Sequence, residues 1–306
     1  MILPLIMLVS LAIAVGLALL LSAYAVMRPP RMTDGKAVYL LKRLSPGDLN
    51  MHFEEMWFKV RDESAGQELN LAGWWIPCPG NSDKTAVLIH GYADAKVGAI
   101  AWAPTWQELG YHILAIDLRA HGESGGQYTT AGVLERHDLD QVLNQLRASR
   151  SAQSKQIVLF GASLGAMVAL ATAAMRDDIA AVVMDSPVLR FRDGVRAQVH
   201  LLGLPLPGMF DWTMRLAKWL CGQDFDRLNS VDLIAAMKCP VMAIQSGDDP
   251  YIDRESAGLI EAAVNRRSDG VYWSLPDVPH LLGLEARPDE YAQRIRQFLK
   301  QNNLST

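Results

Sequence analysis

Short apolar runs rich in valine and isoleucine alternate with longer helix-like stretches through most of this chain, which limits the folds it can adopt. Eight runs are expected to form strands: 54–60, 69–76, 85–89, 112–117, 156–160, 180–185, 240–245 and 271–275. Most lack polar alternation, as is typical of strands buried on both faces of a sheet. Helical patterns separate most of them, over 98–109, 131–148, 164–175, 256–264 and 290–301. The sequence therefore predicts an α/β fold, a mostly parallel eight-stranded sheet with helices on both faces.

Two segments depart from this alternation. No helix separates the first two strands, so we expect them to form an antiparallel hairpin at one edge of the sheet. The segment of about 189–238 lies between two strands but is too long for a simple crossover, and it is rich in aromatic residues and methionine. We interpret it as a helical cap insertion over the carboxyl edge of the sheet.

The run from Ile2 to Met27 contains no charged residue. As a helix it would be about 39 Å long, against roughly 30 Å of bilayer hydrocarbon, so we predict a transmembrane anchor over 1–27. The alternative is a signal peptide, because Ala23-Tyr24-Ala25 resembles a cleavage site. The apolar run is about twice the length of the hydrophobic region of a usual signal peptide, however, and no basic residue precedes it.

Three units are expected: the anchor, a linker over 28–50 that is punctuated by Pro29-Pro30 and Ser45-Pro46-Gly47, and a globular α/β domain over 51–306. Several basic residues follow the apolar run and none precedes it. The positive-inside rule then predicts a single-pass protein with its globular domain on the cytoplasmic side. Export after signal cleavage is the alternative.

Composition argues against several classes of function. The formal net charge of −4 gives no general attraction to nucleic acid. The three cysteines form no CxxC pair, and His137-Asp138 has no further ligands at a suitable spacing, so we expect no metal site. No phosphate-binding glycine loop is present, so we expect no cofactor. The oligomeric state is not indicated.

The strongest local signal is Gly161-Ala-Ser163-Leu-Gly165, which fits the pattern G-x-S-x-G. An apolar strand precedes it and an alanine-rich helix follows, which is the context that makes the pattern informative. Glycines are needed because side chains on either side of such a turn would collide. The helix N-terminus adds partial positive charge where an oxyanion would develop. Ser163 is therefore the predicted nucleophile. The plainer reading is a turn of small residues for close packing.

A serine nucleophile needs a general base. His280 is the best candidate, because it follows the last predicted strand and would face the same sheet edge as Ser163. His121 and His90 also follow strands. The first is expected to be structural, and the second belongs to the loop that should form the oxyanion hole.

The base needs a carboxylate that fixes its tautomer. Asp249 is preferred, in the loop after the seventh strand. Its neighbour Asp248 is the main rival, and Asp185 at the end of the sixth strand is a lesser one. Asp253 is expected to cap the next helix.

Backbone amides should form the oxyanion hole. One is the N–H of Leu164, directly after the nucleophile. The other is the N–H of Tyr92, in the loop that follows the third strand, where Gly91 permits a tight turn. The plainer reading of this loop is an ordinary strand-to-helix connection.

Together these motifs resemble the α/β-hydrolase superfamily, and within it the serine aminopeptidase and monoacylglycerol-lipase-like group with its membrane-anchored members. The shared signatures are His90-Gly91, Asp117-x-Arg119-x-His121-Gly122-x-Ser124, Gly161-x-Ser163-x-Gly165, and His280 followed by Tyr291 and Phe298-Leu299. The resemblance implies catalytic roles for Ser163, Asp249 and His280 and oxyanion roles for Tyr92 and Leu164. The chain departs from the family in having one residue fewer between Gly247 and the acid if Asp249 fills that role.

The resemblance implies a serine hydrolase that acts through an acyl-enzyme. Carboxylic esters, including lipid-like ones, are the expected substrates, because an apolar insertion and an anchor would both favour hydrophobic acyl groups. Thioesters and peptides or amides are the alternatives with the same triad, and an acyltransferase would share it too. A non-catalytic membrane-tethered binding protein is the alternative of another class.

Overall fold

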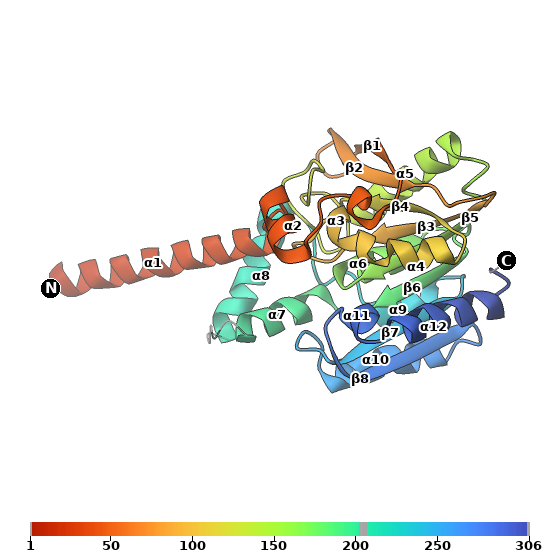
Figure 1. Cartoon of the computed structure of the whole chain (residues 1–306). Helices are drawn as coiled ribbons and strands as arrows, with labels where there is room; N and C mark the ends of the chain where they lie inside the picture. Colours follow the sequence, from red (N-terminus) through yellow and green to blue (C-terminus); the bar gives the residue numbers. More distant parts are fainter. Residues whose placement is uncertain (1, 202, 204–206, 305–306) are drawn as a thin grey trace.

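A computed structural model describes residues 2–201, 203 and 207–304, and a single eight-stranded sheet forms its centre (Figure 1). The strands lie in the order β1-β2-β4-β3-β5-β6-β7-β8. Their bounds are β1 Glu54–Arg61, β2 Glu68–Ile76, β3 Lys84–Ile89, β4 His112–Ile116, β5 Gln156–Ala162, β6 Ala181–Asp185, β7 Val241–Asp248 and β8 Gly270–Pro279. β1 and β2 form an antiparallel hairpin at one edge, β2 pairs antiparallel with β4, and the remaining pairs are parallel. The predicted fold class is confirmed.

Helices cover both faces of the sheet, and alternate residues of each strand contribute to the two cores. Val87 and Ile89 of β3 pack under α5 (Glu135–Ser149), α6 (Leu164–Ala173), α9 (Ser230–Ala236) and α10 (Arg254–Asn265). Ala86 and Leu88 face the opposite layer. That layer contains α3 (Lys96–Ala99), the 3-10 helix η2 (Ile100–Trp102), α4 (Ala103–Glu108), α11 (Gly283–Ala286) and α12 (Pro288–Gln301). This burial on both faces explains why the strands read as continuous apolar runs.

Two predicted helices needed correction. The helix expected over 98–109 is divided into α3, η2 and α4, and Pro104 lies in the first turn of α4. The helix expected from residue 131 begins at Glu135, because Ala131 and Gly132 both have positive φ angles. The Glu135 carboxylate holds this turn by accepting hydrogen bonds from the backbone N–H groups of Thr130 and Gly132, at 2.7 and 2.9 Å.

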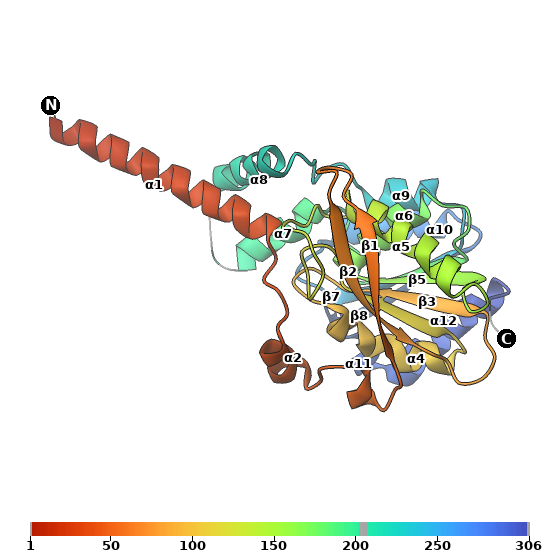
Figure 2. The same ribbon diagram turned by 90° about the horizontal axis from the view of Figure 1, so that it is seen from above.

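The helix α1 (Ile2–Met27) projects away from the globular body in both views (Figures 1 and 2). Its mean hydropathy is 2.7, and it is long and apolar enough to cross a membrane, although a signal sequence would satisfy the same test. Most of its side chains are exposed, while Ala23 and Met27 near its end are buried. The body therefore covers the last turns of α1 and leaves the rest of the helix without a partner among the described residues.

The segment 28–50, expected to be a linker, contains two short helices. The first is α2 (Asp34–Leu41), whose first turn is capped by the Thr33 hydroxyl. The second is the 3-10 helix η1 (Pro46–Leu49), where Ser45 and Asp48 form a capping box. Local capping residues therefore order part of a segment that lacks a hydrophobic period of its own.

The predicted helical insertion is present as α7 (Phe191–Leu201), α8 (Pro207–Cys221) and α9. We call α7 and α8 the cap. The cap shares a hydrophobic cluster with the end of α1 and with Leu164, the residue directly after Ser163. Its buried members are Ala23, Met27, Ala131, Leu164, Phe191, Phe210, Met214, Ala217 and Phe225. The end of α1, the cap and the predicted nucleophile turn thus meet in one packed region.

Candidate active site

Ser163 lies in a strained turn between β5 and α6. Its φ of 52° and ψ of −112° are rare for a residue with a side chain, and such strain is typical of functional turns. Both flanking glycines are required by crowding. A Cβ at Gly161 would overlap the carbonyl oxygen of Gly165, and one at Gly165 would overlap that of Ile89. The turn therefore holds Ser163, which is partly exposed, in a position that larger neighbours would not permit.

The loops after β7 and β8 bring Asp249 and His280 together. An irregularity in the register pairs Asp248 at the end of β7 with Pro279 at the end of β8. Asp249 and His280, the residues that follow these two, therefore lie beside each other. The distance from His280 Nδ1 to Asp249 Oδ2 is 2.6 Å. The second carboxyl oxygen of Asp249 accepts a hydrogen bond of 2.9 Å from the backbone N–H of Tyr251. Only 1% of the Asp249 side chain is exposed, so its carboxylate acts on His280 with little screening by water.

The two rival acids lie in different surroundings. Asp248 is exposed at the end of β7. Asp185 is fully buried, and its oxygens accept hydrogen bonds from Tyr291 Oη at 2.6 Å and Ser186 Oγ at 2.9 Å. Burial raises the pKa of the Asp185 carboxyl above its usual range. Of the three candidate acids, Asp249 is therefore the one that the structure joins to His280. Asp253 caps α10, as expected.

A chain of hydrogen bonds links the Ser163 turn to the His280 loop. The backbone N–H of Ser163 donates to the carbonyl of Asp185 at 2.9 Å. The hydroxyl of the next residue, Ser186, accepts from the backbone N–H of Leu281 at 3.1 Å. Because β5, β6, β7 and β8 are adjacent and parallel, Ser163, Asp249 and His280 all lie at their carboxyl edge.

The loop after β3 packs directly against the Ser163 turn. A Cβ on Gly91 would lie 3.4 Å from the carbonyl oxygen of Ala162 and 3.5 Å from Ser163 Cβ. Tyr92 and Leu164, the predicted oxyanion donors, thus belong to two loops in contact, and Leu164 begins α6.

His90 and His121 both contact the loop that follows β3. His90 Nδ1 donates to the Gly91 carbonyl at 2.7 Å, and its Nε2 accepts from the Leu118 N–H at 3.0 Å. The centroids of the two imidazole rings are 4.9 Å apart, and both side chains are buried. Burial lowers the pKa of His90 to about 4 and that of His121 to about 3, so both are neutral near pH 7. These two histidines have structural contacts, which agrees with our expectation for His121.

Sequence reasoning missed the role of the Tyr92 side chain. Its hydroxyl donates to the carbonyls of Ala25 and Val26 in the last turn of α1, at 2.9 and 3.2 Å. Burial raises the Tyr92 pKa to about 12, so the hydroxyl keeps the proton that it donates. The loop beside Ser163 is thereby tied to the candidate transmembrane helix. Tyr92 is 67 residues from Ala25 and 66 residues from Val26 in the sequence, and no motif predicts a contact over such separations.

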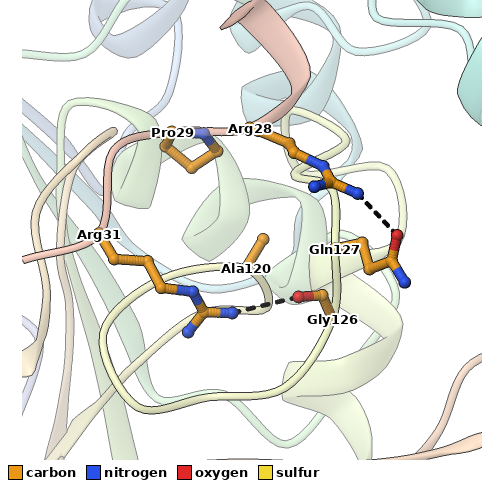
Figure 3. A pocket seen from close by; sticks show the side chains of 6 residues that line it. All are labelled: Arg28, Pro29, Arg31, Ala120, Gly126 and Gln127. Atoms are coloured by element: carbon orange, nitrogen blue, oxygen red, sulfur yellow. Dashed lines mark hydrogen bonds between the residues drawn. The ribbon is translucent and has the colours of Figure 1, made fainter. Parts of the chain in front are cut away.

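The body also satisfies the last carbonyl of α1, which a helix leaves without an intrahelical partner. The Met27 carbonyl accepts from the Thr129 N–H at 2.9 Å. Beyond the helix, Arg28 donates to Gln127 Oε1 at 2.7 Å, and Arg31 donates to four backbone carbonyls, including that of Gly126 at 3.1 Å (Figure 3). A pocket of about 380 Å³ lies here, lined by Arg28, Pro29, Arg31, Ala120, Gly126 and Gln127.

A second pocket is lined by Tyr251, a residue in contact with His280. It has a volume of about 250 Å³ and lies between α7 and the loop after β7. The Tyr251 ring, which lines it, packs edge-on against His280 with 4.8 Å between ring centroids. Its lining combines apolar residues, such as Leu189 and Ile252, with the charged side chains of Asp193 and Arg196.

Comparison with known proteins identifies the relatives of this chain. A sequence model described as the alpha/beta hydrolase family matches residues 86–294. The uncharacterized protein YqkD of Bacillus subtilis (strain 168) is 26% identical over 243 residues, which cover 78% of this chain and 77% of that protein. The Pyrococcus furiosus esterase Pf2001 superposes with a TM-score of 0.71 and 26% identity, covering 90% of this chain and 99% of the esterase. An esterase from Thermogutta terrifontis, at 21% identity and a TM-score of 0.55, shares the fold.

The matched region runs from β3 to α12 and contains the Ser163 turn and the His280–Asp249 pair. The chain therefore belongs to the alpha/beta hydrolase family.

Proposed function

We propose that this chain is a membrane-anchored serine hydrolase that cleaves carboxylic esters, with Ser163 as nucleophile, His280 as base and Asp249 as orienting acid. The hydrogen bond of 2.6 Å between His280 Nδ1 and Asp249 Oδ2, at the sheet edge that also holds the strained Ser163, carries this proposal. The likeness to the Pyrococcus furiosus esterase supports ester chemistry.

The arrangement supports the following steps. The His280 Nδ1–H donates to Asp249, so Nε2 keeps a lone pair that can accept the Ser163 proton. Ser163 Oγ then bonds to the substrate carbonyl carbon, and the protonated His280 gives its proton to the departing alcohol. Water, deprotonated by His280, attacks the acyl-enzyme and releases the acid and free Ser163.

The backbone N–H groups of Tyr92 and Leu164 are the proposed donors to the oxyanion of each tetrahedral intermediate. The contact of Gly91 with the Ser163 turn supports this role, since it brings the two loops together. Losing one such donor costs roughly 3 to 4 kcal/mol of transition-state stabilisation in other hydrolases.

Esters with a hydrophobic acyl group are the proposed substrates. The apolar cluster that joins Leu164 to the cap supports them, as does the partly apolar pocket beside Tyr251 and His280. A thioesterase, an amidase or peptidase, and an acyltransferase would use the same residues. A non-catalytic binding protein is less favoured, because binding alone does not require a strained serine at the same sheet edge as a hydrogen-bonded histidine and acid.

A fluorophosphonate probe tests the nucleophile. The folded wild type should be labelled, Ser163→Ala should not, and Ser149→Ala should be labelled as wild type, because Ser149 is outside the site at the end of α5. Labelling of Ser163→Ala, or none of a folded wild type, would contradict the proposal. Comparing p-nitrophenyl butyrate with a thioester and an anilide of the same acyl group then ranks the substrate classes. Ester formation with an added alcohol would identify an acyltransferase.

We further propose that α1 is a retained anchor over 1–27 and that the domain over 51–306 faces the cytoplasm. The burial of Ala23 and the hydrogen bond from Tyr92 to the Ala25 carbonyl support retention, because cleavage after Ala25 would remove both. The intact mass of the membrane-extracted protein tests retention. Protease protection in intact and permeabilised cells tests the side of the membrane.

A further inference from the structure

The outward face of α8 carries two exposed tryptophans. Trp212 and Trp219 are 61% and 77% exposed, although tryptophan is usually largely buried. They lie seven residues apart, about two helical turns, with Arg215 between them on the same face. The Arg215 guanidinium lies 5.3 Å from the Trp212 ring centroid. We call Trp212, Arg215 and Trp219 the tryptophan face.

The opposite face of α8 is buried in the protein. Phe210, Met214 and Ala217 join the hydrophobic cluster that contains Leu164 and the end of α1. The tryptophan face is therefore not needed to pack the cap onto the body, and no described residue covers it. An exposed apolar strip of this kind indicates a surface for an external partner.

The position of α8 indicates which partner it meets. α8 contacts α1, and both views place it beside the domain-side end of α1 and running across its axis (Figures 1 and 2). A spanning helix runs close to the membrane normal, so a helix across it lies close to the membrane plane. α1 has 26 residues. At 1.5 Å per residue it exceeds the hydrocarbon thickness by about 9 Å, which places its domain-side end among the lipid headgroups.

The chemistry of the tryptophan face suits that depth. Tryptophan concentrates at the membrane interface, where its ring is apolar and its N–H reaches water, and arginine extends toward phosphate groups. We infer that α8 is an interfacial helix whose tryptophan face inserts into the leaflet that α1 enters. This inference rests on the proposal that α1 spans the membrane.

Quenching by brominated lipid tests it. The full-length protein is reconstituted into phosphatidylcholine vesicles with bromine near the top of the acyl chains, and tryptophan emission is compared with that in unbrominated vesicles. The chain has eight tryptophans. Wild type should show a quenched fraction that the Trp212→Phe/Trp219→Phe variant loses. Trp57→Phe should keep it, because Trp57 is 54% exposed but lies on β1.

Vesicle flotation separates the two proposals. If all variants float and the double variant is quenched as strongly as wild type, α1 inserts but α8 does not lie in the interface, and the inference is overturned. If wild type does not float, the anchor proposal and this inference both fail. Fluorophosphonate labelling checks that the double variant is folded, since the changed side chains lie outside the proposed catalytic residues. A second copy of the chain on this face would instead appear as dimers that the double variant abolishes, with no lipid quenching.

Discussion

Replacing Asp249 by asparagine should nearly abolish ester hydrolysis, because it would force His280 into the wrong tautomer. One oxygen of Asp249 accepts from the Tyr251 N–H and the other from His280 Nδ1. An asparagine that keeps its oxygen on Tyr251 presents its NH₂ group to Nδ1. His280 must then carry its proton on Nε2, where it cannot accept the proton of Ser163.

The alternative amide orientation preserves the histidine tautomer but sets the NH₂ group against the Tyr251 N–H. This leaves a part-buried donor unsatisfied, at a cost of about 1 to 3 kcal/mol, so only about one molecule in 5 to 150 has the active orientation. That fraction is slowed further, because asparagine lacks the negative charge that stabilises the imidazolium of His280. A comparable substitution in another serine hydrolase lowers kcat by about 10⁴, which corresponds to about 5 kcal/mol in the barrier. We expect a loss of that order in kcat for p-nitrophenyl butyrate and a similar loss in the rate of fluorophosphonate labelling.

The neighbouring variant Asp248→Asn is the matched control. Its carboxylate is exposed, and water screens its charge, so kcat should stay within about threefold of wild type. The reasoning is refuted if Asp249→Asn keeps more than about a tenth of wild-type kcat, or if Asp248→Asn loses as much as Asp249→Asn. A large loss in Asp248→Asn together with near-wild-type kcat in Asp249→Asn would make Asp248 the acid.

Three further predictions concern stability, measured as urea unfolding of the detergent-solubilised protein. Tyr92→Phe removes the hydroxyl that two carbonyls of α1 share and should lower the unfolding free energy by about 0.5 to 1.5 kcal/mol, whereas Tyr39→Phe, at an exposed site, should change little. Equal effects would refute the capping role. Gly165→Ala should prevent stable folding because its Cβ overlaps the Ile89 carbonyl, while Gly258→Ala in α10, where the Cβ meets open space, should stabilise by about 0.5 to 1 kcal/mol; a stable Gly165→Ala protein would contradict the crowding argument. The pKa of His90 is about 4 in the folded chain and 6.5 in the unfolded chain, so the unfolded chain binds more protons between these pH values. As pH falls through that range, this group lowers the unfolding free energy of wild type by roughly 3 kcal/mol. The difference in unfolding free energy between wild type and His90→Asn should therefore become smaller from pH 7 to pH 5. A constant difference would show that His90 does not titrate as described.

The sheet could be predicted from sequence because its strands are local and unambiguous. The run of β5 is apolar after its first residue, Gln156, and the glycines around Ser163 mark the turn that follows it. Helix boundaries were harder to predict where a side chain binds backbone N–H groups that a helix would otherwise use. Glu135 binds the backbone of the residues before it, and that competition delayed α5 by four residues from the expected start at 131.

The candidate site was predictable to the level of loops but not of single atoms. Sequence placed both Asp248 and Asp249 after β7, and their relation to His280 depends on an irregular register between β7 and β8 that no residue pattern announces. The contact of Tyr92 with α1 depends on how two distant segments pack. The catalytic roles of Ser163, Asp249 and His280 remain predictions for the labelling and kinetic experiments.

The hydrogen bonds that end α1 have a mechanical consequence. A flexible tether would let the globular body rotate relative to α1. Because the last carbonyls of α1 accept hydrogen bonds from Tyr92 and Thr129, the helix is instead fixed to the body at that end. Spanning helices tilt when the bilayer becomes thinner than their apolar length. If α1 spans a membrane as proposed, such a tilt would apply torque first to the loop that carries Tyr92, and the thickness of that membrane would then act on the loop beside Ser163.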